Sequence, residues 1–334
     1  MTAPPPHPIP PSPRAPAAVF ACMRNEGIFL VEWLAYHRVI GFDRVVVCSN
    51  DCDDLSGPLL DALAAGGALD HLPNPVPAGA RPQATGMARV MAHLEPTGIE
   101  WLCHIDADEF LNIGLGQGHV ADLMERAGTG DVIVLAWRLF GDAGHLDWPG
   151  ETLPAFTACM TEDFAPQVSY KSMFRFRDFA AASCHMPLEP RIADPRVRAA
   201  DGGALPNDQL YKVDRIRFKP HARAYRPQAA CVNHYAVRSR DVFLMKNHRG
   251  RAWGLEDNGK YHLNSHWHRL ANRNEAQDRS ILRHWPATQA EMARLRALPG
   301  VAKAEAACRT GFSTLRARLL TPENLTRWTK GVAA

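Results

Sequence analysis

Apolar and polar stretches alternate regularly between residues 17 and 72. Residues 17–27, "AAVFACMRNEG", are a short apolar run that ends in polar residues and a glycine, which predicts a buried strand. In residues 28–41 apolar side chains recur near helical spacing, and Gly41 marks the expected end of a helix. The same pattern predicts a strand over 43–54, a helix over 55–67 and a short strand over 68–72.

This β-α-β-α-β order is typical of a parallel sheet covered by helices. In such sheets ligands bind beyond the carboxyl ends of the strands. Polar groups stand at three predicted strand ends, at residues 24–26, 50–54 and 106–109. We therefore expect these groups to meet at one edge of the sheet.

The pattern weakens toward the C-terminus. Residues 99–113 predict a strand that carries the acidic sequence "HIDADEF", and residues 131–141 predict a strongly buried strand. Residues 186–230 fit no pattern, whereas the chain from residue 272 onward has helical periodicity. Helices are also predicted within 80–98, 120–128 and 239–250, and strands within 169–176 and 231–237.

The composition narrows the class of protein. The 334 residues include 38 basic and 35 acidic side chains, and the net charge of +3 gives no reason to expect nucleic acid as a partner. The eight cysteines form no C-x-x-C pair, which is typical of reduced core cysteines in a cytoplasmic chain. Eight prolines among residues 1–16 predict a disordered tail without the apolar segment of a signal peptide. No apolar run approaches the ~20 residues that a membrane span needs.

The acidic sequence needs a partner of opposite charge. On a strand, Asp106 and Asp108 would point to the same face and repel each other unless a cation lies near them. A hard divalent metal, Mg²⁺ or Mn²⁺, prefers oxygen ligands and usually also holds substrate phosphates. The alternative is a solvated acidic strand end that caps a neighbouring helix. The position after a buried strand favours a metal–diphosphate site.

Four blocks of sequence resemble the family-2-type glycosyltransferases of GT-A fold, in particular the bacterial branch with R-N-E, D-A-D-E-F and H-Y-x-x-R-S motifs. The blocks begin "CMRNEGIFLVEW", "WLCHIDADEFLNI", "WRLFGDAGH" and "VNHYAVRSRDVF". The resemblance covers roughly residues 18–250 and implies an α/β fold, the nucleotide-diphospho-sugar transferase (GT-A, Rossmann-like) mixed sheet flanked by helices. It thereby divides the chain into the tail 1–16, a glycosyltransferase domain over 17–250 and a mainly helical extension over 251–334.

The resemblance implies roles for the side chains at the sheet edge. Asp106 and Asp108 would bind the metal, with His234 as a further ligand, and Asp106 would also reach the donor. Glu109 would face the other way or support the site from behind. The nucleotide of the donor would lie against Arg24, Asn25, Glu26, Asn50, Asp51, Asp53, Arg81 and Gln83.

The implied reaction is transfer of a sugar from a nucleotide-sugar donor to an acceptor hydroxyl, with inversion at the anomeric carbon. The metal would stabilise the departing diphosphate, together with Arg238, Lys246 and Arg249. One carboxylate must take the proton of the acceptor. The candidates for this base are Asp142, Glu162 and Asp163.

The resemblance also implies the partners and the location of the protein. We expect a donor carried on UDP or GDP, a glycan or lipid-linked acceptor, and a role in cell-surface polysaccharide assembly. The protein would be cytoplasmic, with the basic C-terminal helices as a candidate contact with the inner face of the membrane. The alternative function is a non-catalytic scaffold of the same fold that binds carbohydrate or nucleotide. Haloacid-dehalogenase phosphatases and sugar-nucleotide pyrophosphorylases fit less well, because the D-x-D sequence is not on the first strand and no Gly-rich loop follows that strand.

Overall fold

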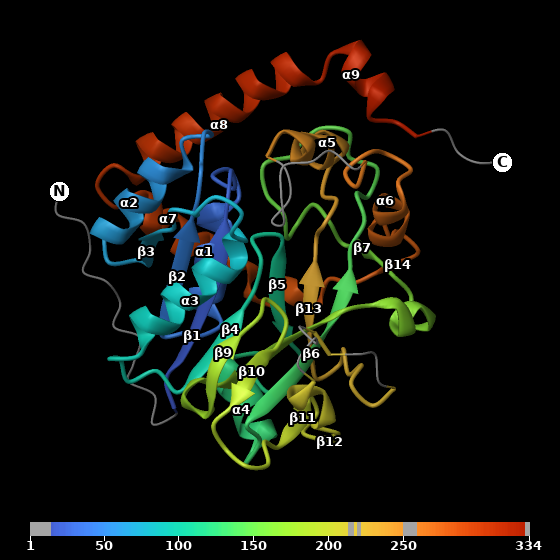
Figure 1. Ribbon diagram of the computed structural model, residues 1–334. Coiled ribbons are helices and arrows are strands. Elements are labelled where there is room, and N and C mark those ends of the chain that lie inside the picture. The colour runs from blue at the N-terminus through green and yellow to red at the C-terminus, as the bar shows by residue number, and fades with distance from the viewer. Residues whose placement is uncertain (1–14, 213–216, 219–221, 250–258, 331–334) are drawn as a thin grey trace.

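The computed structural model describes residues 15–212, 217–218, 222–249 and 259–330 (Figure 1). The proline-rich tail predicted over residues 1–16 lies almost entirely outside these ranges. Within them, a mixed sheet runs through the molecule and helices flank it (Figure 1). The predicted α/β class is therefore confirmed.

The strands in the described ranges form one large sheet and two small ones. They are β1 (Ala17–Met23), β2 (Arg44–Ser49), β3 (Asp70–Pro73), β4 (Trp101–His104), β5 (Glu109–Ile113), β6 (Val132–Leu139), β7 (Ala158–Cys159), β8 (Tyr170–Arg175), β9 (Phe179–Ala182), β10 (Pro187–Pro190), β11 (Val197–Ala199), β12 (Ala204–Leu205), β13 (Ala230–His234) and β14 (Ala276–Gln277). The large sheet has the order β12-β11-β6-β8-β4-β1-β2-β3, and β13 pairs with β6 and β5 beside this path. The small sheets are β9 with β10 and β7 with β14.

The helices lie between and after these strands. The α-helices of the described ranges are α1 (Leu30–Val39), α2 (Ser56–Ala65), α3 (Pro82–Leu94), α4 (Val120–Ala127), α5 (Arg240–Arg249), α6 (His266–Ala271), α7 (Trp285–Arg296), α8 (Val301–Leu319) and α9 (Pro322–Arg327). Short 3-10 helices are η1 (Glu162–Gln167), η2 (Phe176–Asp178), η3 (Asp208–Tyr211) and η4 (Ser280–His284).

The N-terminal part of the chain follows the predicted alternation. Strand β2 pairs in parallel with both β1 and β3, and α1 and α2 make the two connections. All residues of β1 except Cys22 are buried, which explains its continuous apolar run, because a parallel strand is covered on both faces. The predicted β-α-β-α-β order is confirmed here.

The prediction of one continuous strand over residues 99–113 is wrong. The chain forms β4, turns at residues 105–108 and continues as β5. Strand β4 pairs in parallel with β1, whereas β5 leaves this path and pairs antiparallel with β13, with Glu109 opposite His234. Asp106 and Asp108 therefore lie in the turn between two strands, where strand alternation does not orient their side chains.

Strand β8 lies antiparallel between β4 and β6, so the middle of the sheet is mixed. In the segment 186–230, which has no readable pattern, the described residues form the short elements β10, β11, β12 and η3 together with the start of β13. Elements of two to four residues are too short to show a period in the sequence.

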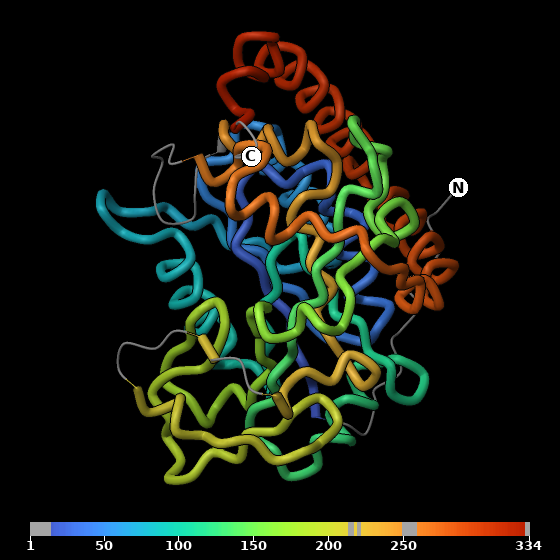
Figure 2. Tube along the Cα trace, turned by 90° about the vertical axis from the view of Figure 1, so that its right-hand side faces the viewer, coloured from blue at the N-terminus to red at the C-terminus, as the bar shows by residue number. Residues whose placement is uncertain are grey.

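The C-terminal helices pack on the N-terminal ones. Helix α7 lies against α1, and α8 runs along α2 toward α5 (Figures 1 and 2). Arg38 Nε of α1 donates to Glu291 Oε1 of α7 at 2.7 Å, and Arg316 Nη1 of α8 donates to Asp241 Oδ2 of α5 at 2.9 Å. None of these helices, in the part of the chain that the structure describes, combines the length and apolarity that a membrane crossing requires.

Candidate functional site

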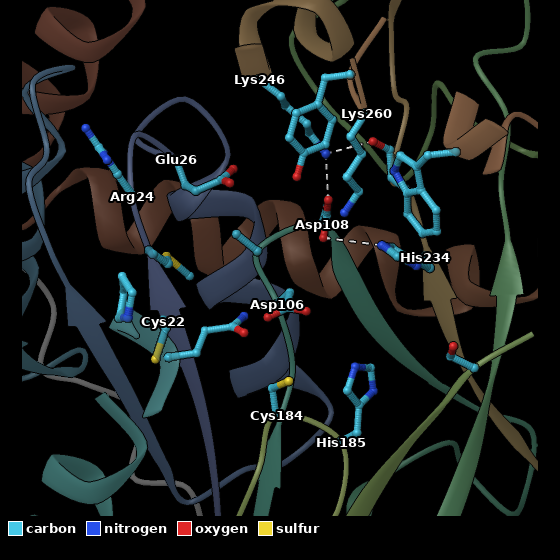
Figure 3. A pocket seen from close by; sticks show the side chains of 18 of the residues that line it. Cys22, Arg24, Glu26, Asp106, Asp108, Cys184, His185, His234, Lys246 and Lys260 are labelled. Atoms are coloured by element: carbon cyan, nitrogen blue, oxygen red, sulfur yellow. Dashed lines mark hydrogen bonds and ion pairs between the residues drawn. The ribbon is translucent and has the colours of Figure 1, made fainter. Parts of the chain in front are cut away.

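A polar pocket opens at the carboxyl ends of β1, β2 and β4 (Figure 3). Its volume of about 590 Å³ is in the range of pockets that bind small molecules. The strand ends meet because β1 pairs in parallel with both β2 and β4. The residues that follow these strands and line the pocket are Arg24 and Glu26 after β1, Asn50 after β2, and Asp106 and Asp108 after β4.

Asp108 lies between a lysine and a histidine (Figure 3). Its Oδ2 accepts a hydrogen bond of 2.7 Å from Lys246 Nζ of α5, and its Oδ1 lies 3.5 Å from His234 Nε2 of β13. Burial by itself would raise the pKa of Asp108, but Lys246 and then His234 hold the pKa well below its usual range. Asp108 is therefore an anion near neutral pH, and one lysine already neutralises it.

Asp106 has a different counterion. Lys171 Nζ of β8 donates to Asp106 Oδ2 at 2.9 Å, and His104 Nε2 lies 3.7 Å from Asp106 Oδ1. Burial opposes ionisation of this carboxyl as well, yet Lys171 and His104 lower its pKa. The Lys171 side chain is fully buried beneath Asp106. Each aspartate thus has its own lysine.

Glu109 supports the turn and does not line the pocket. Its Oε2 accepts a hydrogen bond of 2.9 Å from the backbone N–H of Asp106 and lies 3.1 Å from Lys171 Nζ. The side chain is fully buried, and burial raises the pKa of Glu109 to about 7 in spite of the lysine. Glu109 and Lys171 therefore hold Asp106 in place from behind.

Arg238 holds the same turn through its backbone. Its Nη2 donates to the Ala107 carbonyl at 2.7 Å, and the guanidinium lies 3.7 Å from the centre of the Phe29 ring. The side chain is fully buried, which lowers the pKa of Arg238 to about 10. Arg238 does not line the pocket, so its position does not suit the predicted contact with a diphosphate. The Arg249 side chain, predicted for the same role, lies outside the described part of the structure.

The predicted donor-binding residues separate into two groups of four. Those that line the pocket besides Asp106 are Arg24, Glu26, Asn50 and Gln83. The four that do not are Asn25, Asp51, Asp53 and Arg81. Asn25 and Asp53 instead bond to each other, with the Asp53 N–H donating to Asn25 Oδ1 at 2.9 Å. Asp51 accepts from Asn50 Nδ2 at 3.0 Å, and Arg81 precedes α3 with an exposed side chain.

The three carboxylates predicted as the base do not line the pocket. Asp142 accepts hydrogen bonds from Asn272 Nδ2 at 2.9 Å and Asn274 Nδ2 at 3.3 Å, which fix a surface loop. Glu162 accepts from Gln228 Nε2 at 2.8 Å, and Asp163 is exposed on the same 3-10 helix. The geometry gives none of them access to a ligand in the pocket.

The wall of the pocket that faces away from β1 is aromatic and basic. Figure 3 shows His234 and His185 on the opposite side of the two aspartates from Arg24 and Cys22. The Trp137 ring lies beside both histidines, with its centre 4.3 Å from that of His234 and 5.7 Å from that of His185. Arg217, Lys260, Tyr261 and Trp267 also line the pocket.

Several residues of this site were not predicted from the sequence, among them Lys171 and His185. Lys171 has a signal that can be recognised, because a lysine inside the strand sequence "SYKSMFRF" needs a buried anion as partner. His185 has none, since it follows a strand of four residues in a region without periodicity.

A divalent metal fits at Asp108 and His234 when a substrate completes its coordination. Among the residues that the structure describes, no group of three or more His, Cys, Asp or Glu side chains could hold a metal ion alone. Asp108 Oδ1 and His234 Nε2, 3.5 Å apart, are near the spacing of about 3 Å expected for neighbouring ligands of an octahedral Mg²⁺ ion. Such ions usually take waters and substrate phosphates as their other ligands. The residues present therefore suit a metal that binds together with a diphosphate.

One curated protein gives a partial match. No protein-family model matches the chain. Over 141 residues, or 41% of the chain, the sequence is 26% identical to a glycosyltransferase family 92 protein from Ricinus communis. The match spans 25% of that protein's length. The chain is thus similar to part of a glycosyltransferase, one named for family 92, whereas the sequence motifs resemble family 2.

The likeness to solved structures is slight. Glucosyl-3-phosphoglycerate synthase from Mycobacterium tuberculosis, in complex with Mn²⁺, UDP and glucosyl-3-phosphoglycerate, is 16% identical over 37% of this chain and 44% of that chain, with a TM-score of 0.27. HddC from Yersinia pseudotuberculosis is 10% identical over 48% of this chain and 77% of that chain, with a TM-score of 0.30.

Proposed function

We propose that the protein is a nucleotide-sugar glycosyltransferase and that the donor binds in the pocket at the ends of β1, β2 and β4. One observation carries this proposal: Asp106 and Asp108 face a pocket of about 590 Å³, beside Lys246 and His234. Such a set of groups can hold a ribose, a metal and a diphosphate at once. The partial similarity to a glycosyltransferase supports the same class of reaction.

In this proposal Mn²⁺ or Mg²⁺ binds with the donor to Asp108 and His234. The metal would stabilise the negative charge that develops on the departing diphosphate. Lys246, whose ammonium lies 2.7 Å from Asp108, would add a second positive charge at the same place. Asp106, fixed by Lys171, would orient the ribose or a water on the metal.

The remaining pocket residues suit the two substrates. Arg24, Glu26, Asn50 and Gln83 would contact the base and ribose of a UDP or GDP donor. The aromatic wall would receive the acceptor, a glycan or a lipid-linked sugar, because sugar rings pack on aromatic faces. As in family-2-type enzymes, the sugar would move by a single displacement that inverts the anomeric carbon. Polysaccharide assembly in the cytoplasm, at the inner face of a membrane, is the setting that this chemistry fits.

Calorimetry with nucleoside diphosphates tests the proposal. We expect UDP or GDP to bind only with Mn²⁺ or Mg²⁺, and Asp108→Asn to weaken that binding at least about tenfold, because it removes the anion that holds the metal. Glu125→Gln is the matched control, since Glu125 is exposed on α4 and outside the pocket. If UDP, GDP, CDP and dTDP all fail to bind with either metal, the proposal is wrong. Binding without turnover of any nucleotide sugar would instead indicate the non-catalytic scaffold.

A further inference from the structure

The hairpin between β9 and β10 brings a histidine into the pocket. Residues 183–186 form its tip, from which Cys184 and His185 line the pocket (Figure 3). Two carbonyl groups of the tip contact side chains of the large sheet. His104 Nδ1 of β4 lies 3.0 Å from the Cys184 carbonyl, and Ser172 Oγ of β8 donates to the His185 carbonyl at 3.1 Å. The position of His185 is therefore fixed by the core of the molecule.

Hydrogen bonding decides which nitrogen of His185 carries the proton. Its Nδ1 lies 2.9 Å from the backbone carbonyl of Tyr170. A carbonyl only accepts hydrogen bonds, so Nδ1 is the protonated nitrogen and Nε2 of the neutral ring keeps a lone pair. No residue in the described part of the chain forms a hydrogen bond with this Nε2. The ring points from the hairpin toward the two aspartates, beside Trp137 (Figure 3).

The neutral form of this ring is favoured near pH 7. Burial, and after it the Lys171 charge, lower the pKa of His185 to about 4. This value is close to the ordinary pKa of about 4 of a carboxyl group. His185 therefore has the base strength of a carboxylate without its charge.

The pocket also contains carboxylates, and each of these has a cation as its partner. The carboxylates that line it within the described residues are Glu26, Asp106 and Asp108. Each lies beside a cation: Glu26 Oε2 is 3.8 Å from Arg238 Nη1, and the aspartates bond to Lys171 and Lys246. Asp142, Glu162 and Asp163 do not reach the pocket at all. His185 Nε2 therefore offers a lone pair that is not engaged by a cation, whereas each carboxylate of the pocket lies beside one.

We propose that His185 is the catalytic base that takes the proton of the acceptor hydroxyl, an inference that rests on the proposed function. In this step the O–H proton moves to His185 Nε2. The electron pair of the oxygen forms a bond to the anomeric carbon of the donor sugar. The bond between that carbon and the diphosphate oxygen breaks, and its electron pair leaves with the nucleoside diphosphate. Water can replace the acceptor, so slow hydrolysis of the donor follows the same step.

The test separates the base from the anchor. In His185→Asn the side-chain nitrogen lies near the place of Nδ1 and can still donate to Tyr170, whereas nothing replaces Nε2. With UDP-glucose or GDP-mannose, whichever matches the diphosphate that binds, we expect hydrolysis about 100-fold slower and nucleotide affinity within about twofold of wild type. His266→Gln, at an exposed position of α6 outside the pocket, should behave as wild type in both assays.

Chemical rescue distinguishes a catalytic base from a residue that only supports the structure, because an added base can replace the first but not the second. In His185→Ala, added imidazole should restore hydrolysis in proportion to the concentration of its neutral form. The proposal is overturned if His185→Asn hydrolyses the donor at the wild-type rate, or if His185→Ala loses activity that imidazole does not restore. Failure of the underlying function looks different, because then the wild type itself would neither bind a nucleotide nor hydrolyse a nucleotide sugar.

Discussion

Replacing Lys171 with methionine removes the charge that two acidic side chains share. The Lys171 ammonium lies 2.9 Å from Asp106 and 3.1 Å from Glu109, and it is fully buried. At an effective dielectric constant of 20 the two attractions amount to about 6 and about 5 kcal/mol before any desolvation is counted. Because desolvation offsets most of such a gain, removal of one partner usually costs about 3–5 kcal/mol. We expect Lys171→Met to lose an amount in this range at pH 7.

Most of the lost stability should come from Glu109, which keeps a buried charge without its counterion. The Asp106 side chain is 28% exposed and can turn toward water in the pocket, whereas the Glu109 side chain is 0% exposed. Its simplest response is to bind a proton, which its pKa of about 7 already favours. The double variant Lys171→Met/Glu109→Gln, which carries no unpaired buried charge at this position, should therefore recover most of the lost stability.

Urea unfolding followed by circular dichroism measures these differences. We expect a lower midpoint for Lys171→Met with an unchanged slope, and a melting temperature lower on the order of 5–10 °C. Lys303→Met, at an exposed position of α8, should stay within about 0.5 kcal/mol of wild type. The reasoning is refuted if Lys171→Met is as stable as Lys303→Met, or if the Glu109→Gln change makes Lys171→Met still less stable.

Three further predictions concern other parts of the molecule. His37 is fully buried, and burial lowers its pKa to about 3, below the value of about 6.5 in the unfolded chain. The free energy of unfolding therefore falls as the pH drops through 6.5, because the unfolded chain binds a proton that the folded chain does not. Between pH 7 and pH 5 this decrease should be about 2 kcal/mol smaller in His37→Phe than in wild type. Gly114→Ala would place a Cβ 1.9 Å from the Gln228 backbone oxygen, and its urea midpoint should drop by an amount worth about 2 kcal/mol, whereas Gly98→Ala, with open space around the Cβ, should leave the midpoint unchanged or higher. Asp142→Ala should weaken the loop around it but leave nucleotide affinity in calorimetry within about twofold of wild type, and a tenfold loss would contradict the placement of Asp142 outside the pocket.

The first half of the fold was predictable because its signals are local. Strands β1 and β2 are covered on both faces and read as continuous apolar runs, and α1 and α2, the helices that follow them, end within two residues of a glycine. The break between β4 and β5 was not predictable, because apolar residues stand on both sides of the turn at 105–108. What separates the two strands is the pairing of β5 with β13, more than 100 residues further along the chain.

The candidate site likewise has a part that could be predicted from the sequence and a part that could not. Asp106, Asp108 and His234 belong to motifs that are visible in the sequence, and the structure brings them to one pocket. Their partners come from distant segments, with Lys171 65 residues from Asp106 and Lys246 138 residues from Asp108. Only tertiary pairing decides which lysine meets which aspartate, so no local pattern could assign them.

The place of β8 between β4 and β6 has a consequence for synthesis of the chain. Both neighbours leave the ribosome before β8, and until residues 170–175 have emerged each of them lacks its partner in the middle of the sheet. Unpaired apolar strand edges readily join other chains. A nascent chain that stops at Gly150 would therefore aggregate and would not fold as a smaller domain, even though its β-α-β-α-β part is complete. The large sheet can therefore form only late in translation. Until β8 has emerged, β4 and β6 expose unpaired edges, and this is the interval in which chaperones are most needed to prevent aggregation.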